Sequence, residues 1–577
     1  MKKFGDDLPV PQDRVSKPEC EAVLQASVTQ TTSAKPMSQM LKSSGAMGAA
    51  TLLSRVLGLV REQVYAGFMG DTAVASAFKL AFQVPNLFRR LLGEGALTAA
   101  FIPVFKRKEH TEGEAAMWRA AHEVMSALLV VGGALVVVVV AGISVVLFLS
   151  ESGILGVRAG LIDPNESEWL HRDTKLVLQL LRIMFPYLVL VCLAALLMAM
   201  LNARGHFFVP ATGAAMLNIV MIGSVLLMAP WFGKTLDTQV FALAIGVLLA
   251  GIAQVTFQIP ALYKEGFRFR WASPRNSETV REVARKMVPG AIGLAAYQIN
   301  VLVIGGVSFW VDRSVVASFD YAVRLMEFPQ GVIGISLATY LLPTLSGLAA
   351  AKRYPDFRRT LREGLGYLLF FNLLASVLLV VLGEPIVRLL FERGRFTEAS
   401  THRAAVALIC LAPGLVAFST VNILARAFYA LGDTKTPMLV SIFCLGLNLV
   451  FSLWLVGPFR QGGLGVANTM SSFFNVWLLL YALRRKLKRL EFGPLVPTAV
   501  TLLGAAVAAG LATWGVLQLW EPSIGHSTLP AKIGEVFVPA GVGTAVYAAL
   551  ALALRVPEAQ AAIEFLKKNL KSPSTDG

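Results

Sequence analysis

The sequence is divided into long apolar runs separated by short polar joints, and this pattern limits the possible folds more than any other feature. Each run reaches about 20 residues, the length of a helix that crosses the hydrocarbon core of a bilayer. Of the 577 residues, 55% are hydrophobic and only 15% are charged, whereas a soluble chain of this length would carry much more surface charge. We therefore predict an all-α polytopic membrane protein.

Hydropathy and run length together indicate about fourteen transmembrane helices. We expect the first six to form an N-lobe (43–262), the next six a C-lobe (263–490), and the last two an extra pair (491–555). A polar cytoplasmic extension (1–42), without the apolar core of a secretory signal, and a cytoplasmic tail (556–577) complete the chain. The predicted spans are 44–68, 73–104, 117–149, 175–201, 207–229, 238–262, 284–310, 314–347, 362–383, 402–430, 436–457, 463–484, 495–518 and 533–554.

Lysine and arginine are concentrated in every second joint between spans. Examples are "KRK" at 106–108, "AKRYPDFRRTLR" at 351–362 and "RRKLKR" at 484–489, whereas the intervening joints are poorer in these residues. Cytoplasmic loops carry this excess, so we predict a multi-pass membrane protein with cytoplasmic N- and C-termini. The same rule accounts for the net charge of +16 without nucleic-acid binding.

Several kinds of chemistry have no support in the sequence. There is no P-loop motif, and we find no pair of intramembrane aspartates that would hold Mg²⁺ for a polyprenyl-phosphate transferase. The four cysteines are widely spaced and the six histidines have no metal-ligand spacing. We therefore predict no enzyme activity, no cofactor and no metal.

Charged residues nevertheless occur inside the apolar runs. The first span, "SRVLGLVREQVYAGFMG", contains Arg55, Arg61 and Glu62, with Arg55 about 16 Å along the helix axis at 1.5 Å per residue. The eighth span, "FDYAVRLMEFPQGVIG", contains Arg324 and Glu327 on one helical face. The second span carries a polar stripe with flanking charges, namely Lys79, Gln83, Asn86 and Arg90 with Arg89 and Glu94.

Proline and glycine interrupt the same helices. Pro85 lies in the second span, and Pro329 and Gly331 lie in the eighth, at matching positions of the two halves. Pro289 and Gly290 lie in the seventh. Interrupted helices at matching positions point to a midplane binding site, so we expect these residues to act as hinges.

The intramembrane charges have two interpretations. They can be structural ion pairs between helices. Alternatively, they line a water-filled cavity, which is favoured collectively because six cations outnumber three acids and each unpaired charge costs about 2.5–3.5 kcal/mol at mid-depth. Arginine forks match phosphate oxygens, so a cationic cavity would suit a phosphate-bearing solute. The cations are Arg55, Arg61, Lys79, Arg89, Arg90 and Arg324, and the acids are Glu62, Glu94 and Glu327.

Six motifs resemble the MurJ (MviN) family of bacterial lipid II flippases, of the multidrug/oligosaccharidyl-lipid/polysaccharide exporter superfamily. They are "SRVLGLVREQVYAGFMG", "PNLFRRLLGEGALTAAFIPVF", "LNARGHFFVPATGAAMLNI", "KMVPGAIGLAAYQIN", "RLMEFPQGVIGISLATYLLPTLS" and "FYALGDTKTPM". The resemblance implies two lobes around a central cavity and a final helix pair forming a groove for the lipid tail. It also implies transport of lipid II from the inner to the outer leaflet by alternating access.

The resemblance also assigns roles to residues. Arg55, Arg89 and Arg324 would bind the diphosphate, whereas Arg61, Glu62 and the remaining polar and charged residues of the spans would tune or gate the cavity. The family has acidic residues where this sequence has Ser76 and Val323, and a lysine where it has Gln83. Some members bind sodium between spans seven and eleven, which here contain no acid, so the coupling ion stays open.

Other functions remain possible from the sequence. One alternative is export of a drug or of another polyprenyl-linked glycan. Drug exporters favour cationic substrates, and an excess of cationic side chains in the spans argues against a drug. A membrane-embedded transferase would need a pair of intramembrane acids, which this sequence lacks. A scaffold without transport would not need charges inside its membrane spans, which this sequence has. The implied partners are lipid II, membrane lipids and the cell-wall synthesis machinery.

Overall fold

The computed structural model describes residues 37–89, 97–151, 164–490, 493–562 and 564. Every regular element in these ranges is helical, which confirms the predicted all-α class. Eight of the described helices are long and apolar enough to cross a membrane, or ten when two bent helix pairs are each counted as one span.

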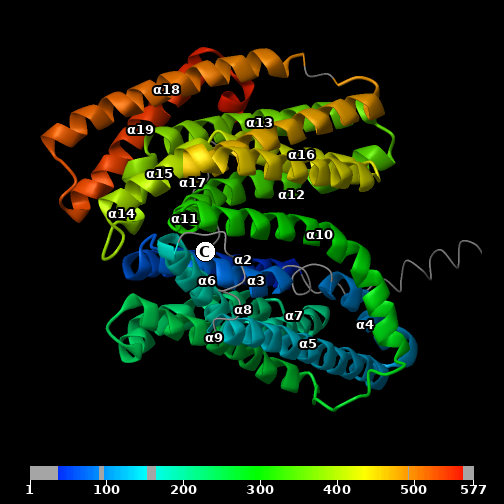
Figure 1. Cartoon of the computed structure of the whole chain (residues 1–577). Helices are drawn as coiled ribbons and strands as arrows, with labels where there is room; N and C mark the ends of the chain where they lie inside the picture. The colour runs from blue at the N-terminus through cyan, green and yellow to red at the C-terminus, as the bar shows by residue number, and fades with distance from the viewer. Residues whose placement is uncertain (1–36, 90–96, 152–163, 491–492, 563, 565–577) are drawn as a thin grey trace, which may run out of the picture.

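Helices α2 to α9 form a first group, drawn in blue to green in the lower half of Figure 1. Within it, α8 packs against α2 and α9, and α7 packs against α9. Gly251 permits the close approach of α7 and α9, because a Cβ there would lie 2.8 Å from the ring of Tyr187. The helices are α2 (Met37–Met69), α3 (Ala73–Phe88), α4 (Thr98–Glu112), α5 (Glu114–Glu151), α6 (Pro164–Met184), α7 (Tyr187–Ala203), α8 (Phe208–Gly223), the π-turn η2 (Ser224–Met228), the 3₁₀-turn η3 (Ala229–Phe232) and α9 (Leu236–Lys264).

A second group occupies the upper half of Figure 1, with α10 running along the boundary between the groups. Helix α10 contacts α3, α4 and α5 of the first group and α11 and α17 of the second. Helices α18 and α19 pair with each other on the outer side of the second group, against α13 and α14. The helices are α10 (Glu278–Val311), α11 (Val315–Pro329), the π-turn η4 (Gln330–Ile335), α12 (Ser336–Ala350), α13 (Tyr354–Val381), α14 (Gly383–Phe391), α15 (Glu398–Leu411), α16 (Gly414–Ala430), α17 (Lys435–Leu487), α18 (Leu495–Ser523) and α19 (Leu529–Ala553).

Helix α17 is two helices joined by a sharp turn. Its 53 residues are continuous except at Arg460, where φ is 49° and ψ is −126°. The guanidinium of Arg460 lies 3.1 Å from the carboxylate of Asp312, which ties this turn to the α10–α11 connection.

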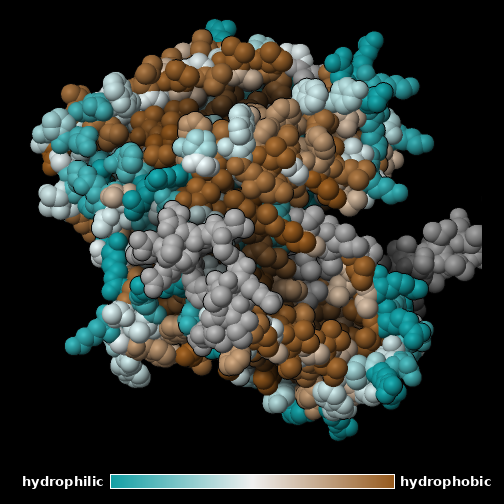
Figure 2. All heavy atoms as spheres, in the orientation of Figure 1, coloured by the Kyte–Doolittle hydropathy of each residue, from teal (hydrophilic) through white to brown (hydrophobic). Residues whose placement is uncertain are grey.

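The outer surface is apolar across both groups. Figure 2 shows hydrophobic atoms over the middle of the molecule and hydrophilic atoms gathered at its left and right ends. In α5, only 6% of the most apolar stretch is buried, and Val131 and Phe148 are each 69% exposed. An apolar face of this size on a chain with several spans indicates contact with lipid.

The two ends of the molecule differ in composition. The left end in Figure 1 carries α14 and the turn between α2 and α3, and we call it the latch end. The right end carries the end of α4 and the start of α13, and we call it the basic end because its charged residues include Arg107, Arg204, Arg268, Arg353, Arg359 and Lys486.

Candidate functional site

A cavity of about 940 Å³ lies between the two helix groups. Its lining residues come from α2, α3 and α8 of the first group, from α10, and from α11, η4, α15, α16 and α17 of the second. Near the latch end the lining includes Ser308 and Leu464, and toward the basic end it reaches Tyr429 and Thr434.

One side of the cavity is formed by charged residues, and we call it the charged wall: Arg61, Glu62, Lys79, Asp320, Arg324 and Glu327. Glu62 is only 4% exposed and lies 2.5 Å from the guanidinium of Arg61. The Arg61 guanidinium also donates to Oδ1 of Asn218 on α8 at 3.1 Å. The buried Arg61–Glu62 pair thus holds α2 against α8 through Asn218, which gives a structural role to two adjacent charges in an apolar run.

Lys79 connects α3 to α11. Its ammonium donates to Asp320 at 2.7 Å, lies 3.8 Å from Glu62 and sits 3.4 Å from the centre of the Tyr321 ring. Because the Lys79 side chain is only 10% exposed, both carboxylates are needed to compensate its charge away from bulk water.

Arg324 lies in the same network but faces the cavity more openly. Its side chain is 35% exposed, and its Nη1 donates to Glu327 at 3.0 Å. Its Nε lies 4.0 Å from Glu62. Spacing of three and four residues along α11 puts Asp320, Arg324 and Glu327 on one face of the helix.

The charged wall is electrically balanced. Three cations and three carboxylates line the described part of the cavity, which differs from the cationic excess that the sequence suggested. The difference arises because Asp320 adds an acid that the sequence interpretation missed, although it precedes Arg324 by one helical turn. In addition, Arg55 and Arg89 are not among the lining residues.

Arg55 and Arg89 lie nearer the basic end than this wall. Arg55 is about 9 Å from Arg61 along α2, and its Nη1 would lie 2.6 Å from a Cβ placed on Gly331 of η4. Arg89 donates from Nε to Oδ1 of Asn86, which does line the cavity, at 2.8 Å. Gln83 also lines the cavity, whereas Arg90 and Glu94 lie outside the described residues.

The predicted hinge positions have different surroundings. Pro329 is the last residue of α11 and is followed by η4, which contains Gly331, so the helix changes its winding there. Helix α3 continues through Pro85 to Phe88, and α10 continues through Pro289 and Gly290.

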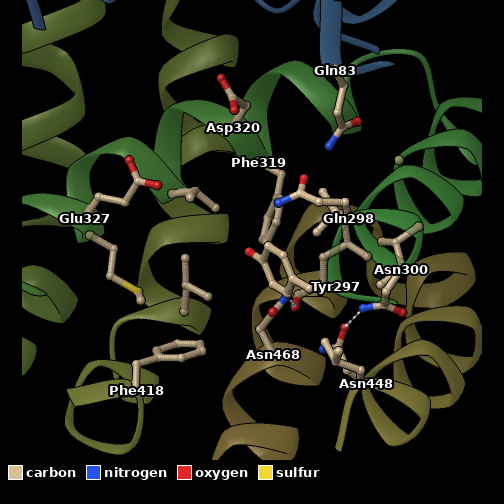
Figure 3. Close-up of a pocket in the computed structure, with 18 of the residues that line it drawn as sticks. Gln83, Tyr297, Gln298, Asn300, Phe319, Asp320, Glu327, Phe418, Asn448 and Asn468 are labelled. Atoms are coloured by element: carbon tan, nitrogen blue, oxygen red, sulfur yellow. Dashed lines mark hydrogen bonds between the residues drawn. The ribbon is translucent and has the colours of Figure 1, made fainter. Parts of the chain in front are cut away.

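The opposite side of the cavity is neutral and rich in amides, and we call it the amide wall: Tyr297, Gln298, Asn300, Asn448, Asn468 and Asn475. Figure 3 shows Tyr297, Gln298, Asn300, Asn448 and Asn468 of this wall together with Asp320 and Glu327. Asn300 donates to Asn448 at 3.2 Å, and Asn448 donates to Ser471 at 3.2 Å. The site predictions omitted this wall, although single asparagines inside apolar spans were a visible signal.

At the latch end, the two groups contact each other directly through what we call the latch. Asp71, in the α2–α3 turn, is 3% exposed and accepts two bonds from the Arg403 guanidinium at 2.6 and 2.8 Å. Ser400 donates to the same carboxylate at 2.6 Å. Tyr321 donates from its hydroxyl to the carbonyl of Gly70 at 3.2 Å. A carboxylate with this many charge-assisted partners closes the cavity at this end.

Main-chain atoms complete the latch. The amide of Arg395 donates to the carbonyl of Gly67 at 2.9 Å. Gly394 has φ of 58°, and a Cβ there would lie 2.3 Å from the carbonyl oxygen of Gly67. Likewise, a Cβ on Gly70 would lie 2.5 Å from the carbonyl oxygen of Arg395. The two turns touch backbone to backbone because neither glycine carries a side chain.

At the basic end, the ion pairs lie on side chains that are mostly partly exposed. Arg107 of α4 binds both carboxylate oxygens of Glu282 on α10, one of them at 2.9 Å, and Lys286 reaches the same group at 2.8 Å. These hydrogen bonds, first from Arg107 and then from Lys286, lower the pKa of Glu282 to about 2. Arg204 similarly contacts Glu109, Glu114 and Glu265 at 2.7–3.2 Å.

Curated relatives align with most of the chain. A Vibrio cholerae protein named probable lipid II flippase MurJ is 33% identical over 501 residues, which cover 83% of this chain and 92% of that protein. A Rhizobium tropici protein of the same name is 31% identical over 532 residues, covering 92% of this chain and 97% of that protein.

Solved structures with this fold are transporters. A lipid II flippase MurJ in an inward closed conformation matches with a TM-score of 0.67 and 21% identity, covering 88% of this chain and 98% of that one. An inward-facing multidrug resistance MATE transporter of the MOP superfamily matches with a TM-score of 0.59 and 13% identity, covering 77% and 98%. The family model described as lipid II flippase MurJ matches residues 65–533, and the chain therefore belongs to the MurJ family.

Proposed function

We propose that this protein is a lipid II flippase, a transporter and not an enzyme, that moves the undecaprenyl-diphosphate-linked peptidoglycan precursor from the inner to the outer leaflet by alternating access. The observation that carries this proposal is a cavity between two helix groups whose wall holds buried ion pairs, in a member of the MurJ family. Buried charges at mid-depth are expensive and mark a solute pathway.

The proposal includes fourteen spans, a count that assumes that broken helices are joined and that α17 is divided at Arg460. The pairs α3/α4, α6/α7, α11/α12 and α15/α16 would each cross once, and the remaining long helices would also cross once each. Spans one to six and seven to twelve then form the two lobes. The α18–α19 pair, joined to them by residues 488–494, would provide the groove for the lipid tail.

We place the basic end in the cytoplasm and the protein in the inner membrane. Lys and Arg concentrate at this end, and cytoplasmic segments retain such residues during insertion. Both termini would be cytoplasmic, and the extension 1–42 would be dispensable for transport. Single cysteines in a Cys-free background test this: an impermeant reagent added outside should label position 167 and leave 273 unlabelled, and the opposite result contradicts the orientation.

Arg324 is the group on the charged wall best placed to take a diphosphate. Its partner Glu327 is 48% exposed, and an exposed pair three residues apart is worth only about 0.5 kcal/mol. A diphosphate can therefore replace Glu327 and use the arginine fork for two oxygens. Arg61, Glu62 and Lys79 are more buried and would instead hold the wall and tune its charge.

Arg55 and Arg89 complete the proposed diphosphate site. Both lie between the charged wall and the basic end, so the substrate would meet them first on entering from the cytoplasm. Arg90 and Glu94, which follow directly in sequence, would tune the same approach. The amide wall would face the glycan and peptide, because amides donate to and accept from hydroxyl and peptide groups without adding charge.

The Arg324 proposal is tested by complementation of a flippase-depleted strain, with membrane abundance measured in parallel. Arg324→Ala should abolish growth, and Arg324→Lys should restore little because an ammonium lacks the bidentate fork. Arg359→Ala, a 70% exposed arginine at the basic end, is the matched control and should grow normally.

A double variant separates substrate binding from a structural ion pair. If Arg324 only neutralises Glu327, Arg324→Ala/Glu327→Ala should grow normally. We expect no growth at normal abundance, together with accumulated lipid II that stays protected from an externally added lipid II-degrading toxin. Full growth of the double variant would return Arg324 to a structural role.

A second candidate is export of a drug or another polyprenyl-linked glycan. Two observations favour this candidate: the fold is similar to that of a multidrug transporter, and the charged wall has equal numbers of acidic and basic side chains. Depletion distinguishes the two functions: lipid II accumulates only if lipid II is the substrate, whereas a drug exporter changes drug susceptibility alone. Cell-wall synthesis enzymes would be the natural partners of a lipid II flippase.

A further inference from the structure

Three potential metal ligands converge at the latch end of the α18–α19 pair, far from the charged wall in sequence. Glu521 lies near the end of α18, His526 in the connecting loop and Glu535 in α19. Their ligand-type atoms all lie within 4.8 Å of one another. Gly534 allows this approach, because a Cβ there would lie 2.3 Å from the ring of Trp520.

Two of these groups have buried polar atoms that no described residue satisfies. Glu535 is 1% exposed, and its Oε2 has no hydrogen-bond partner. Nδ1 of His526 is also buried and without a partner. A buried carboxylate oxygen and a buried imidazole nitrogen are costly when unmatched, and a single cation between them would satisfy both.

The surrounding charges leave room for a divalent cation. Glu535 accepts from Arg388 through Oε1 at 2.6 Å, and Arg388 also lies near Glu384 and Glu392. Lys532 pairs with Glu392 at 3.0 Å. Four described carboxylates share this neighbourhood with two cationic side chains, so the acids outnumber the cations. The acids are Glu384, Glu392, Glu521 and Glu535, and the cations are Arg388 and Lys532.

We propose that Glu521, His526 and Glu535 bind a divalent transition-metal ion, with Zn²⁺ preferred. One imidazole nitrogen and two carboxylate oxygens form a three-ligand set that zinc accepts, with water in the fourth position. Ligand bonds of about 2.0–2.2 Å in a tetrahedral site require the three atoms to draw closer, and the exposed side chain of Glu521 can move to allow this.

Metal binding here would fix the α18–α19 turn to the second helix group. Glu535 would share its two oxygens between the ion and Arg388 of α14, so the ion would connect the loop at His526 to α14 through one side chain. The alternative is a protonated His526 that pairs with Glu535 as an ion pair and binds no metal.

The test is Zn²⁺ titration of the purified full-length protein in detergent by isothermal calorimetry, after removal of metal with a chelator. We expect one site with micromolar or tighter affinity. His526→Ala and Glu521→Gln should each weaken binding at least about 10-fold, since even the loss of a residue that only orients a metal ligand has an effect of this size. Both positions lie outside the buried Arg388–Glu535 pair, so folding should be preserved.

His402→Ala is the matched control, because His402 lies 3.8 Å from Glu384 in the same neighbourhood but outside the proposed ligand set. It should bind Zn²⁺ like the parent. Co²⁺ in place of Zn²⁺ should give visible absorption that the His526→Ala variant lacks. Equal binding by the parent and His526→Ala would overturn the proposal in favour of the ion pair. Binding is measured without transport, so this outcome is independent of the flippase assays.

Discussion

The two ends of the cavity are closed by different interactions. At the latch end, a buried carboxylate, Asp71, is bound by a bidentate arginine and a serine, next to direct backbone contacts between turns. At the basic end, the Arg107–Glu282 contact is more open to water: its side chains are 49% and 16% exposed, compared with 33% and 4% for Arg403 and Asp71. The cavity lining also extends to Tyr429 and Thr434 at the basic end.

This difference indicates which end controls the conformational change. Exposed ion pairs contribute little because water and salt compete for the charges, whereas a buried pair that loses one partner leaves an uncompensated charge. Under the proposed alternating access, we expect the latch to open and re-form in each transport cycle, whereas the basic end can separate with a small change in free energy.

The largest effect is expected for Asp71→Asn. Removing this charge leaves Arg403 without its carboxylate partner. The closed state should be destabilised by about 3 kcal/mol, the lower limit for a broken buried pair, because the Arg403 side chain is 33% exposed. The latch-open state should become about 100-fold more populated. We would measure labelling of Ser308→Cys, in the cavity near the latch, by an impermeant thiol reagent added outside cells.

Asp237→Asn provides the control for this measurement. Asp237 also pairs with an arginine, Arg172, but both side chains lie exposed within the first group, at 47% and 68%. Its labelling should equal that of the parent. If Asp71→Asn also labels at the parental rate, the latch does not hold the cavity closed.

A smaller effect is expected for Ser400→Ala. This change removes one charge-assisted hydrogen bond from Asp71 but leaves the bidentate arginine in place. Such a bond contributes about 1.5–3 kcal/mol, and the remaining Arg403 contact should compensate part of it. Labelling at position 308 should rise less than in Asp71→Asn, and an equal or larger rise would show that the serine, not the ion pair, dominates.

A still smaller effect is expected for Glu282→Gln at the basic end. The exposed contact with Arg107 should be replaced by water, so labelling of the cavity from the cytoplasmic side in inverted vesicles should change by less than about twofold. If Glu282→Gln changed labelling as much as Asp71→Asn does, the two ends of the cavity would not differ in how strongly they are held closed.

The smallest effect concerns pH. The pKa of Glu282 is lowered from 4.5 to about 2 by Arg107 and Lys286, so its contribution to stability is present above about pH 4.5 and is lost as the pH falls toward 2. The difference in unfolding temperature between the parent and Glu282→Gln should be constant from pH 8 to pH 5 and shrink below that. A difference that varies between pH 8 and pH 5 would mean that another group titrates at this contact.

The sequence was sufficient for the helical class because the length of each apolar run is a local property. It also identified Arg61, Glu62, Lys79, Arg324 and Glu327, because a charge in an apolar run is visible without knowledge of its neighbours. The pairing of these residues was not predictable, since Lys79 and Asp320 are 241 positions apart.

Other features could not be read from the sequence for physical reasons. The balance of the charged wall depends on which helical faces meet, and Asp320 joins it only because α11 packs against α3. The latch brings Asp71 to Arg403 across 332 positions, and neither residue differs in kind from ordinary loop charges. The amides of the opposite wall were visible singly, but their common surface requires α10 and α17 to lie side by side.

The absence of side chains at Gly70 and Gly394 has a consequence for the speed of the cycle. Where two turns meet through main-chain atoms, there are no side-chain rotamers to order when the contact forms, so re-closing loses only backbone conformational entropy at that point. Side-chain ordering at the latch then falls mainly on the docking of Arg403 on Asp71, where the guanidinium must meet the carboxylate in one bidentate geometry.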